Sequence, residues 1–263
     1  MTDTAPATLD VTDGLATLTL TRAGAANALD RGLKSELLRL VRQIADDTSV
    51  RAVLILADGK NFCVGQDLGE HVDGLRADPS TAMSTVGADY NPLIRALAGI
   101  DVPVVAAING ACVGAGLGIA LVADIRVAAE SATFATAFTG IALAADSGLS
   151  HTLPASVGPS RAAGLLLLGD RFGAANALDW GLVHRVVPDD ELRGQAMKLA
   201  TRLATGPTAA YRAVKSLVTH PAATLDDALE AERVAQERLG ATADHSAAVE
   251  AFLAKSKPVF TGS

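Results

Sequence analysis

One carboxylate, Asp146, stands in the middle of small and apolar residues, in the stretch GIALAADSGLSHTLP at 140–154. A charged group among such neighbours must be exposed, paired, used to cap a helix, or held in an environment that perturbs it for chemistry. The DSG sequence before an apolar run also suits a helix N-cap. From these residues alone, Asp146 is therefore either a capping or surface group or a base whose pKa is raised by its surroundings.

Two glycine-rich turns, NFCVGQDL at 61–68 and NGACVGAGLG at 109–118, each follow an apolar run that predicts a buried strand. Glycine lets backbone N–H groups face a ligand, and the second turn opens a helix whose free N–H groups favour negative charge. Together the turns could form an anion site, or the glycines could only allow tight turns and close helix packing. A phosphate loop is disfavoured because GACVGAG lacks the Gly-Lys-Ser/Thr ending and the G-x-G-x-x-G pattern.

Strands and helices in alternation would position these groups. Residues 8–22 alternate around Asp13-Gly14 and predict a β-hairpin. Further along, the pattern predicts a helix at 30–47 that Asp30 caps, buried strands at 52–58 and 101–110, a polar loop at 59–80, a helix through YNPLIRALAGI, a helix at 114–124, and strands at IRVAA and ATFATA. These segments indicate stacked β-α-β units, and hence an α/β fold.

After Gly140 the pattern changes to helices, with one predicted strand at 183–187. The last helices, from about residue 207 to 255, are amphipathic: Leu217, Leu225, Leu229, Val234, Val249 and Phe252 stand on a charged background. Such a tail needs a surface to cover, on its own subunit or on a neighbour.

Composition narrows the class of protein. With 263 residues, of which 49% are hydrophobic and 19% charged, the chain can bury a large core as one domain. No apolar run reaches the roughly 20 residues that span a bilayer, and MTDTAPATLD lacks the features of a signal peptide. We therefore expect a soluble cytoplasmic protein that does not have a membrane as a partner. A net charge of −7 and 3% aromatic residues argue against nucleic acid as a partner.

The cysteines and histidines suggest neither a disulfide framework nor a metal site. Cys63 and Cys112 lack the spacing of either, which fits a reducing compartment. His71, His184, His220 and His245 form no ligand pattern, so no metal is predicted. His151 follows Asp146 by five residues and would point elsewhere on a helix, which makes it a weak partner for that carboxylate.

The chain resembles the crotonase, or enoyl-CoA hydratase/isomerase, superfamily over nearly its whole length. The resemblance rests on LTLTRAGAANAL, FCVGQDL, AINGACVGAGLGIALVADIRVAAESATF, LLLLGDRFGAANALDWGLVHRVV and FLAKSKPVFTGS, in the order and spacing of that family. It implies an α/β fold of the ClpP/crotonase type, a spiral of β-β-α units with a C-terminal helical trimerisation region. A core at 1–200 would bind acyl-CoA and carry catalysis, and a region at 201–263 would serve oligomerisation and CoA contact.

The same resemblance implies an acyl-CoA thioester as substrate, a trimer or dimer of trimers as assembly, and no cofactor, since coenzyme A is part of the substrate. Its shared device is an oxyanion hole of two backbone N–H groups, which fall on Gln66 and Ala115. Such donors can stabilise the negative charge of a thioester enolate by roughly 3 kcal/mol each.

Contacts with the rest of the substrate are also implied by the resemblance. Those to the adenosine part fall on the backbone of Ala26, Ala28 and Val64, and those to the phosphates fall near Arg22 and, from a neighbouring subunit, on Lys255 with Phe252. Further substrate contacts are expected at Gly65, Asp67, Leu68, Gly114 and Phe138. Ala25 stands where the family often has Lys, and Arg22 and Lys255 could equally be solvated surface charges. For Asp67 and Glu70 the residues themselves favour roles as caps or as solvated loop residues.

The reaction is narrowed by two replaced carboxylates. The hydratases of the family use two glutamates to add water, and the corresponding positions here hold Gly118 and Phe138. Without them the means of activating water is missing. Asp146 falls where several isomerases and a dehalogenase of the superfamily carry a working aspartate, and a single carboxylate suits an isomerisation.

A closer resemblance narrows the substrate. FATAFTGIALAADSGLSHTLP, GQDL, YNPLIRAL and FLAKSKPVFTG are similar to the branch that isomerises ring-1,2-epoxyphenylacetyl-CoA in phenylacetate degradation. The prediction is therefore an acyl-CoA isomerase for that epoxide or for a related enoyl-CoA. The alternatives are other acyl-CoA chemistry of the hydratase type, nucleophilic attack by Asp146, and an idle acyl-CoA-binding protein.

Overall fold

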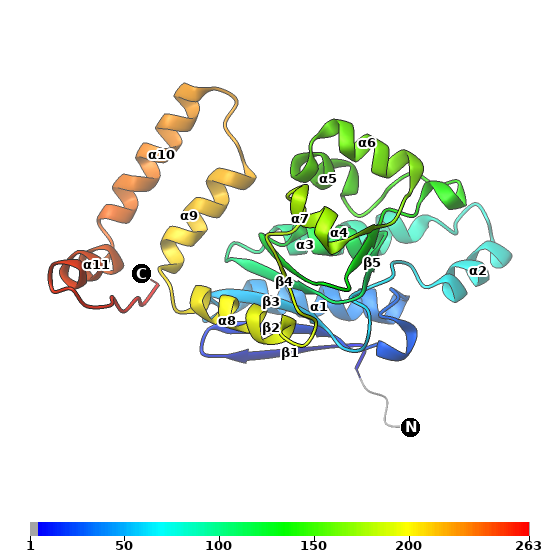
Figure 1. The fold of residues 1–263 in the computed structure, drawn as a ribbon, viewed down its shortest axis with the longest axis horizontal. Helices are drawn as coiled ribbons and strands as arrows, with labels where there is room; N and C mark the ends of the chain where they lie inside the picture. The colour runs from blue at the N-terminus through cyan, green and yellow to red at the C-terminus, as the bar shows by residue number, and fades with distance from the viewer. Residues whose placement is uncertain (1–4, 263) are drawn as a thin grey trace.

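A six-stranded sheet forms the centre of the molecule (Figure 1). The structure, a computed structural model, describes residues 5–262. The strand order is β1-β2-β3-β4-β6-β9, with β1 antiparallel to β2 and every other neighbouring pair parallel. The strands are β1 (Ala7–Thr12), β2 (Leu15–Leu20), β3 (Ala52–Ala57), β4 (Val104–Ile108), β6 (Ile125–Ala129) and β9 (Arg185–Val187). The predicted hairpin around Asp13-Gly14 is confirmed, and so are the strands at 52–58 and 101–110.

A second, smaller sheet lies beside the first and joins β5 (Ala111–Val113), β7 (Thr133–Ala135) and β8 (Phe172–Gly173). The chain thus passes twice through a strand of the large sheet, a strand of the small sheet and a helix: β4, β5 and α4 (Ala115–Val122), then β6, β7 and α5 (Leu149–Val157). This confirms the predicted α/β fold of β-β-α units. The prediction of a single strand after residue 140 is wrong, because β8 is also a strand.

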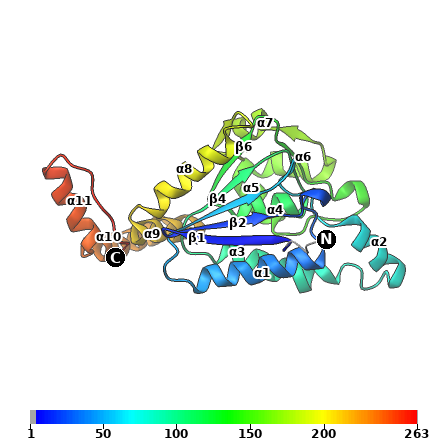
Figure 2. The same ribbon diagram turned by 90° about the horizontal axis from the view of Figure 1, so that it is seen from below.

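Helices cover both faces of the large sheet (Figure 2). On one face α1 (Arg31–Asp46) and α3 (Asn91–Ala98) join the larger apolar core with α4 and α5. On the opposite face α8 (Leu192–Ala204) packs Leu192, Ala196, Ala200 and Ala204 against β3 and β4. The predicted cap of α1 is confirmed, since the Asp30 side chain accepts a hydrogen bond from the N–H of Leu33 at 2.8 Å.

The predicted loop at 59–80 is partly wrong, because it contains the helix α2 (Leu68–Ala77). None of the residues of α2 is buried, although Leu68, Val72 and Leu75 recur in it at helical spacing. Asp67 caps the helix by accepting from the N–H groups of Gly69 and Glu70. A π-helical turn, η2 (Val86–Tyr90), then leads into α3.

The C-terminal helices extend away from the sheets, at the end of the molecule opposite α2 (Figures 1 and 2). They are α9 (Thr208–Thr219), α10 (Leu225–Gly240) and α11 (Ala243–Leu253). Earlier in the chain, α6 (Pro159–Leu168) follows α5, and α7 (Ala174–Asp179) lies between β8 and β9. Large apolar side chains stay exposed on or after these last helices: Val214, Val218, Leu225, Leu229, Val234, Val249, Phe252, Leu253 and Val259. The helix α8 crosses the predicted division at residues 200 and 201, and that division stays a prediction. Within residues 5–262, no helix combines the length and apolarity needed to cross a bilayer.

Candidate active site

The two glycine-rich turns lie side by side because a short backbone bridge joins them. The Cys63 N–H donates to the Ala111 carbonyl at 3.1 Å, and the Val113 N–H donates to the Cys63 carbonyl at 2.9 Å. A Cβ at Gly116 would lie 2.4 Å from the Cys63 carbonyl oxygen, so only glycine lets α4 begin this close to the first turn. Burial raises the pKa of the Cys63 thiol to about 12, which leaves this cysteine an inert packing group.

The N–H groups of Gln66 and Ala115 lie on adjoining segments of these turns. Gly65 has a φ of +86°, and a Cβ there would lie 3.5 Å from the Ala115 nitrogen. The N–H of Leu29 donates to the Gly65 carbonyl and the N–H of Asp67 donates to the Leu29 carbonyl, so the Gln66 N–H between them faces away from this bridge. Within residues 5–262, neither the Gln66 N–H nor the Ala115 N–H donates to a protein acceptor. Two unused donors are thus available for an anionic oxygen.

Asp146 is half-buried and does not cap a helix with its side chain. The N-cap of α5 is Gly148, with no side-chain capping bond, so the capping interpretation of Asp146 is wrong. Its Oδ1 accepts a hydrogen bond from the Ser147 hydroxyl at 2.8 Å. Burial raises the pKa of Asp146, while the Ser147 hydrogen bond and the positive charge of Lys34 act in the opposite direction without cancelling the rise. A carboxylate with a raised pKa is suited to take a proton.

The space where a glutamate at position 118 would lie is filled by Ser147. A Cβ at Gly118 would lie 2.6 Å from the Ser147 Cβ and 2.7 Å from its carbonyl oxygen. Ser147 is buried and has a φ of 52°, a left-handed conformation that few side chains adopt without strain. Phe138 is also buried, and its ring edge would lie 3.9 Å from a Cβ at Gly114. Ser147 therefore joins Asp146 to the first turns of α4, the helix that begins at Ala115.

A buried polar network lies next to the first turn, and the sequence did not predict it. The Lys34 side chain is fully buried, and its Nζ donates to Gln66 Oε1 at 3.2 Å and forms an ion pair with Glu70 at 3.0 Å. Tyr90 donates its hydroxyl to the same Gln66 oxygen at 2.6 Å. A signal for Lys34 does exist: it lies three residues before Leu37 and seven before Val41, both of them on the buried side of α1.

Asp67 and Glu70 have different structural roles. Capping by Asp67 is confirmed, as described above for α2. Glu70 instead links α2 to α1, because its carboxylate accepts hydrogen bonds from the N–H of Arg31 at 2.6 Å and from Nζ of Lys34. Solvation alone is therefore a wrong description of Glu70.

The residues predicted to contact coenzyme A divide into two groups. Near the first turn, Arg22 pairs with Asp30 at 3.0 Å and with Asp67 at 3.2 Å and donates to the Ala28 carbonyl, so its charge is already matched by two carboxylates. Ala26, Val64 and Leu68 belong to the same part of the molecule, and Leu68 is 67% exposed. At the opposite end, Phe252 and Lys255 lie on and after α11, with Phe252 81% exposed. The structure does not bring Phe252 and Lys255 to the turns of their own chain.

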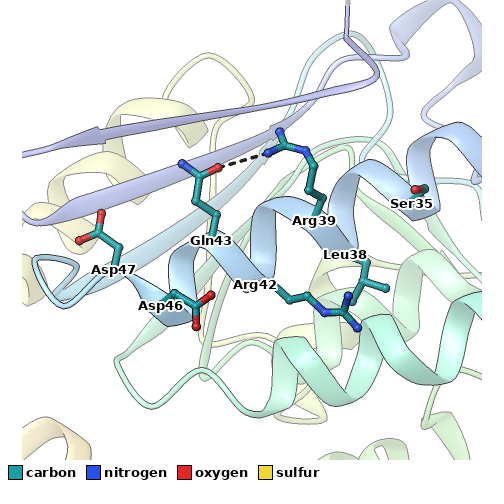
Figure 3. A pocket seen from close by; sticks show the side chains of 7 residues that line it. All are labelled: Ser35, Leu38, Arg39, Arg42, Gln43, Asp46 and Asp47. Carbon is teal, nitrogen blue, oxygen red and sulfur yellow. Dashed lines mark hydrogen bonds between the residues drawn. The ribbon is translucent and has the colours of Figure 1, made fainter.

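Two surface hollows lie elsewhere. One of about 680 Å³ follows the outer side of α1, where Arg39 donates to Gln43 at 3.4 Å (Figure 3). Another of about 260 Å³ lies between the ends of α1 and α3 and Arg212 of α9. Neither is lined by Gln66, Ala115 or Asp146.

His151 is exposed. No cluster of three His, Cys, Asp or Glu side chains suited to a metal occurs within residues 5–262.

Comparison with known proteins shows the family of this chain. Residues 10–263 match the enoyl-CoA hydratase/isomerase family. The chain belongs to the enoyl-CoA hydratase/isomerase family. It is 40% identical to the 1,2-epoxyphenylacetyl-CoA isomerase of Escherichia coli over 254 residues, which cover 96% of this chain and 97% of that one.

Other relatives in the family carry different names. A Rhodobacter capsulatus protein that bears the name of an enoyl-CoA hydratase is 38% identical, with 96% of both chains covered. The crystal structure of a Mycobacterium abscessus protein named for the enoyl-CoA hydratase/isomerase family superposes with a TM-score of 0.96 at 57% identity, covering 98% of this chain and 100% of that one. The family consists of enzymes, and an acyl-CoA thioester substrate is consistent with membership.

Proposed function

We propose that this enzyme is an acyl-CoA isomerase in which the N–H groups of Gln66 and Ala115 form an oxyanion hole and Asp146 acts as the base. Its substrate would be 2-(1,2-epoxy-1,2-dihydrophenyl)acetyl-CoA or a related enoyl-CoA. The observation that carries the proposal is the half-buried carboxylate of Asp146, joined through Ser147 to the helix that presents the Ala115 N–H. The name of the Escherichia coli relative supports the choice of substrate.

The proposed chemistry needs no water. For a β,γ-enoyl thioester, Asp146 takes the proton from the α-carbon, and the electron pair moves onto the thioester oxygen, where the two N–H groups stabilise it. When the carbonyl forms again, the γ-carbon takes the proton back from Asp146, and the double bond has moved to the α,β position. The carboxylate is regenerated. Only one acid/base group is required, in agreement with Gly118 and Phe138 at the positions of the two glutamates.

A small panel of thioesters tests this function. We expect the purified protein to isomerise a β,γ-enoyl-CoA or the ring-epoxide of phenylacetyl-CoA, and to hydrate crotonyl-CoA at least about 100-fold more slowly, because no second carboxylate positions water. Absorbance follows the double bond, and mass spectrometry separates isomerisation, which leaves the mass unchanged, from hydration, which adds one water. Efficient hydration of crotonyl-CoA would contradict the proposal. Binding without turnover of any thioester would favour the idle acyl-CoA-binding protein.

We also propose that the C-terminal helices assemble the chain into a trimer or a dimer of trimers. The nine exposed apolar side chains on or after α9–α11 support this, because an amphipathic tail that leaves its own core needs another surface. In the assembly, Lys255 and Phe252 would reach the coenzyme A bound to a neighbour. We expect light scattering at micromolar concentration to give three or six times the chain mass of 26.7 kDa. A monomer at that concentration would exclude the assembly and this source of substrate contacts.

A further inference from the structure

Lys34 is the centre of the buried network next to the first glycine turn. A lysine ammonium has three donors, and among residues 5–262 Nζ donates to Gln66 Oε1 at 3.2 Å, Glu70 Oε1 at 3.0 Å and Thr85 Oγ1 at 2.6 Å. Asp89 Oδ2 forms a second ion pair with Nζ at 3.7 Å. The three hydrogen-bond acceptors come from the turn, from α2 and from the segment before η2. One buried charge on α1 therefore ties together the three segments around the proposed oxyanion hole.

The Gln66 side chain uses every hydrogen-bonding position of its amide. Its Oε1 accepts from Lys34 and from the Tyr90 hydroxyl, which fills both lone pairs. Its Nε2 donates to Glu70 Oε1 at 3.1 Å and to the Asp67 carbonyl at 3.3 Å. The amide is thus fixed in one orientation, and with it the backbone of the residue whose N–H is the proposed donor.

An apolar residue at position 34 would fill the same volume without the desolvation cost of an ammonium. It would not orient the Gln66 amide, and it would place no positive charge near Asp146. The ring of Tyr90 also lies under the ammonium, with Nζ 5.0 Å from the ring centre. Lys34 and Tyr90 therefore hold the same Gln66 oxygen from two elements, and each can be changed separately.

We propose that Lys34 and Tyr90 are positioning residues that hold the Gln66 N–H in its oxyanion-hole orientation through the Gln66 side chain. The inference rests on the proposed function for the identity of the oxyanion hole. An oxyanion hole of two backbone N–H groups does not by itself require a particular side chain at position 66, so this role of the Gln66 amide is additional. Neither side chain needs to touch the substrate for this role.

The charge of Lys34 has a second effect, on Asp146. The titratable groups around this region are Lys34 from α1, Glu70 from α2, Asp89 and Tyr90 from η2, and Cys63 from the turn. Burial and the negative charge of Asp146 raise the pKa of Tyr90, so the phenol stays protonated and remains a donor to Gln66. The Lys34 charge lowers the pKa of Asp146, so its removal raises that pKa further.

The test uses Lys34→Met and Tyr90→Phe in the full-length protein, with cinnamoyl-CoA as a spectroscopic probe. Hydrogen bonds to the thioester oxygen of this conjugated acyl group shift its absorbance to longer wavelength when it binds. We expect the wild type and Asp146→Asn to show the shift, and Lys34→Met and Tyr90→Phe to lose more than half of it. Lys215→Met is the matched control, because it removes an internal ion pair with Asp124 at 2.7 Å in a different part of the fold. It should keep the full shift.

Turnover of the substrate found in the panel gives the second measurement. We expect kcat of Lys34→Met and Tyr90→Phe to fall about tenfold to a hundredfold with KM changed less than threefold, since a misplaced donor loses mainly transition-state stabilisation. The base works when ionised, so activity rises with pH through the pKa of Asp146. That rise should move to higher pH in Lys34→Met and stay in place in Tyr90→Phe, which keeps the charge.

The outcomes separate this inference from the proposed function. An unchanged absorbance shift in folded Tyr90→Phe and Lys34→Met overturns the positioning role even if the wild type is an active isomerase. Loss of the shift in both variants supports the role even if no thioester of the panel is isomerised, in which case the proposed function fails alone. A wild type that shows no shift excludes the oxyanion hole and the inference together. If Lys34→Met does not fold, Tyr90→Phe decides, because it removes a single oxygen atom.

Discussion

Asp146→Asn is expected to lower kcat by about 100-fold or more, with a thermal unfolding temperature close to that of the wild type. Asparagine has nearly the same shape and can still accept from the Ser147 hydroxyl, so the local hydrogen bond of 2.8 Å can persist. It cannot take a proton. The helix α5 does not depend on this side chain, since its N-cap is Gly148. The kinetic loss should therefore come without a loss of folding, measured by steady-state turnover and by calorimetry.

The matched control for this variant is Asp170→Asn, which neutralises an exposed carboxylate after α6. It should keep the wild-type rate, which excludes a general effect of net charge. Isomerase activity in Asp146→Asn within a few-fold of the wild type would end the assignment of Asp146 as base. A covalent adduct between substrate and Asp146, detected by mass spectrometry, would instead assign the residue as a nucleophile.

Gly65→Ala is expected to reduce kcat by at least about 100-fold, the effect of losing one oxyanion donor. Its φ of +86° is unfavourable for alanine, and the new Cβ would lie 3.0 Å from the Val113 carbonyl oxygen and 3.5 Å from the Ala115 nitrogen. Both are backbone atoms that cannot swing away. The two turns must therefore separate, which moves the Gln66 N–H relative to the Ala115 N–H. Turnover and the cinnamoyl-CoA shift should both fall.

Gly194→Ala in α8 is the control for this change, because a Cβ there meets nothing within 4 Å and the helix favours alanine over glycine by about 1 kcal/mol. It should keep full activity and unfold at the same or a higher temperature. A Gly65→Ala enzyme with the wild-type rate would show that the separation of the two turns does not control the reaction. The N–H of Gln66 would then lose its proposed role.

The sequence predicts helices and strands well where they are long and carry a regular apolar pattern. The helix at 30–47, with its Asp30 cap, and the strands of the large sheet carry strong apolar patterns and were placed within a few residues. The small sheet was not predicted as a sheet, because β5 and β7 have three residues each and β8 has two, too few to show a period. The helix α2 was not predicted, although Leu68, Val72 and Leu75 recur in it at helical spacing, because its two glycines lower the helix propensity of the segment.

The glycine turns and Asp146 could be predicted from the sequence, and the side chains that surround them could not. Glycine turns after parallel strands can be located from the sequence, since those strands end at one edge of a sheet. The network around Lys34 could not be located in this way, because Gln66, Glu70, Thr85 and Tyr90 are brought to it by tertiary packing. The surroundings of Asp146 could not be predicted either. A capping role fits the sequence DSG, but Ser147 and Gly148 adopt left-handed conformations, and the Asp146 side chain does not cap α5.

The contact between Gly118 and Ser147 restricts how this enzyme could be redesigned. A glutamate at position 118 would need the volume that the Ser147 Cβ and carbonyl now occupy, 2.6 and 2.7 Å from the nearest possible Cβ. The residue that blocks this place is Ser147, which lies next to Asp146 and donates its hydroxyl to the Asp146 carboxylate. A carboxylate side chain at this position of α4 therefore needs a new path for the backbone around Ser147, which an exchange of residue 118 alone does not supply.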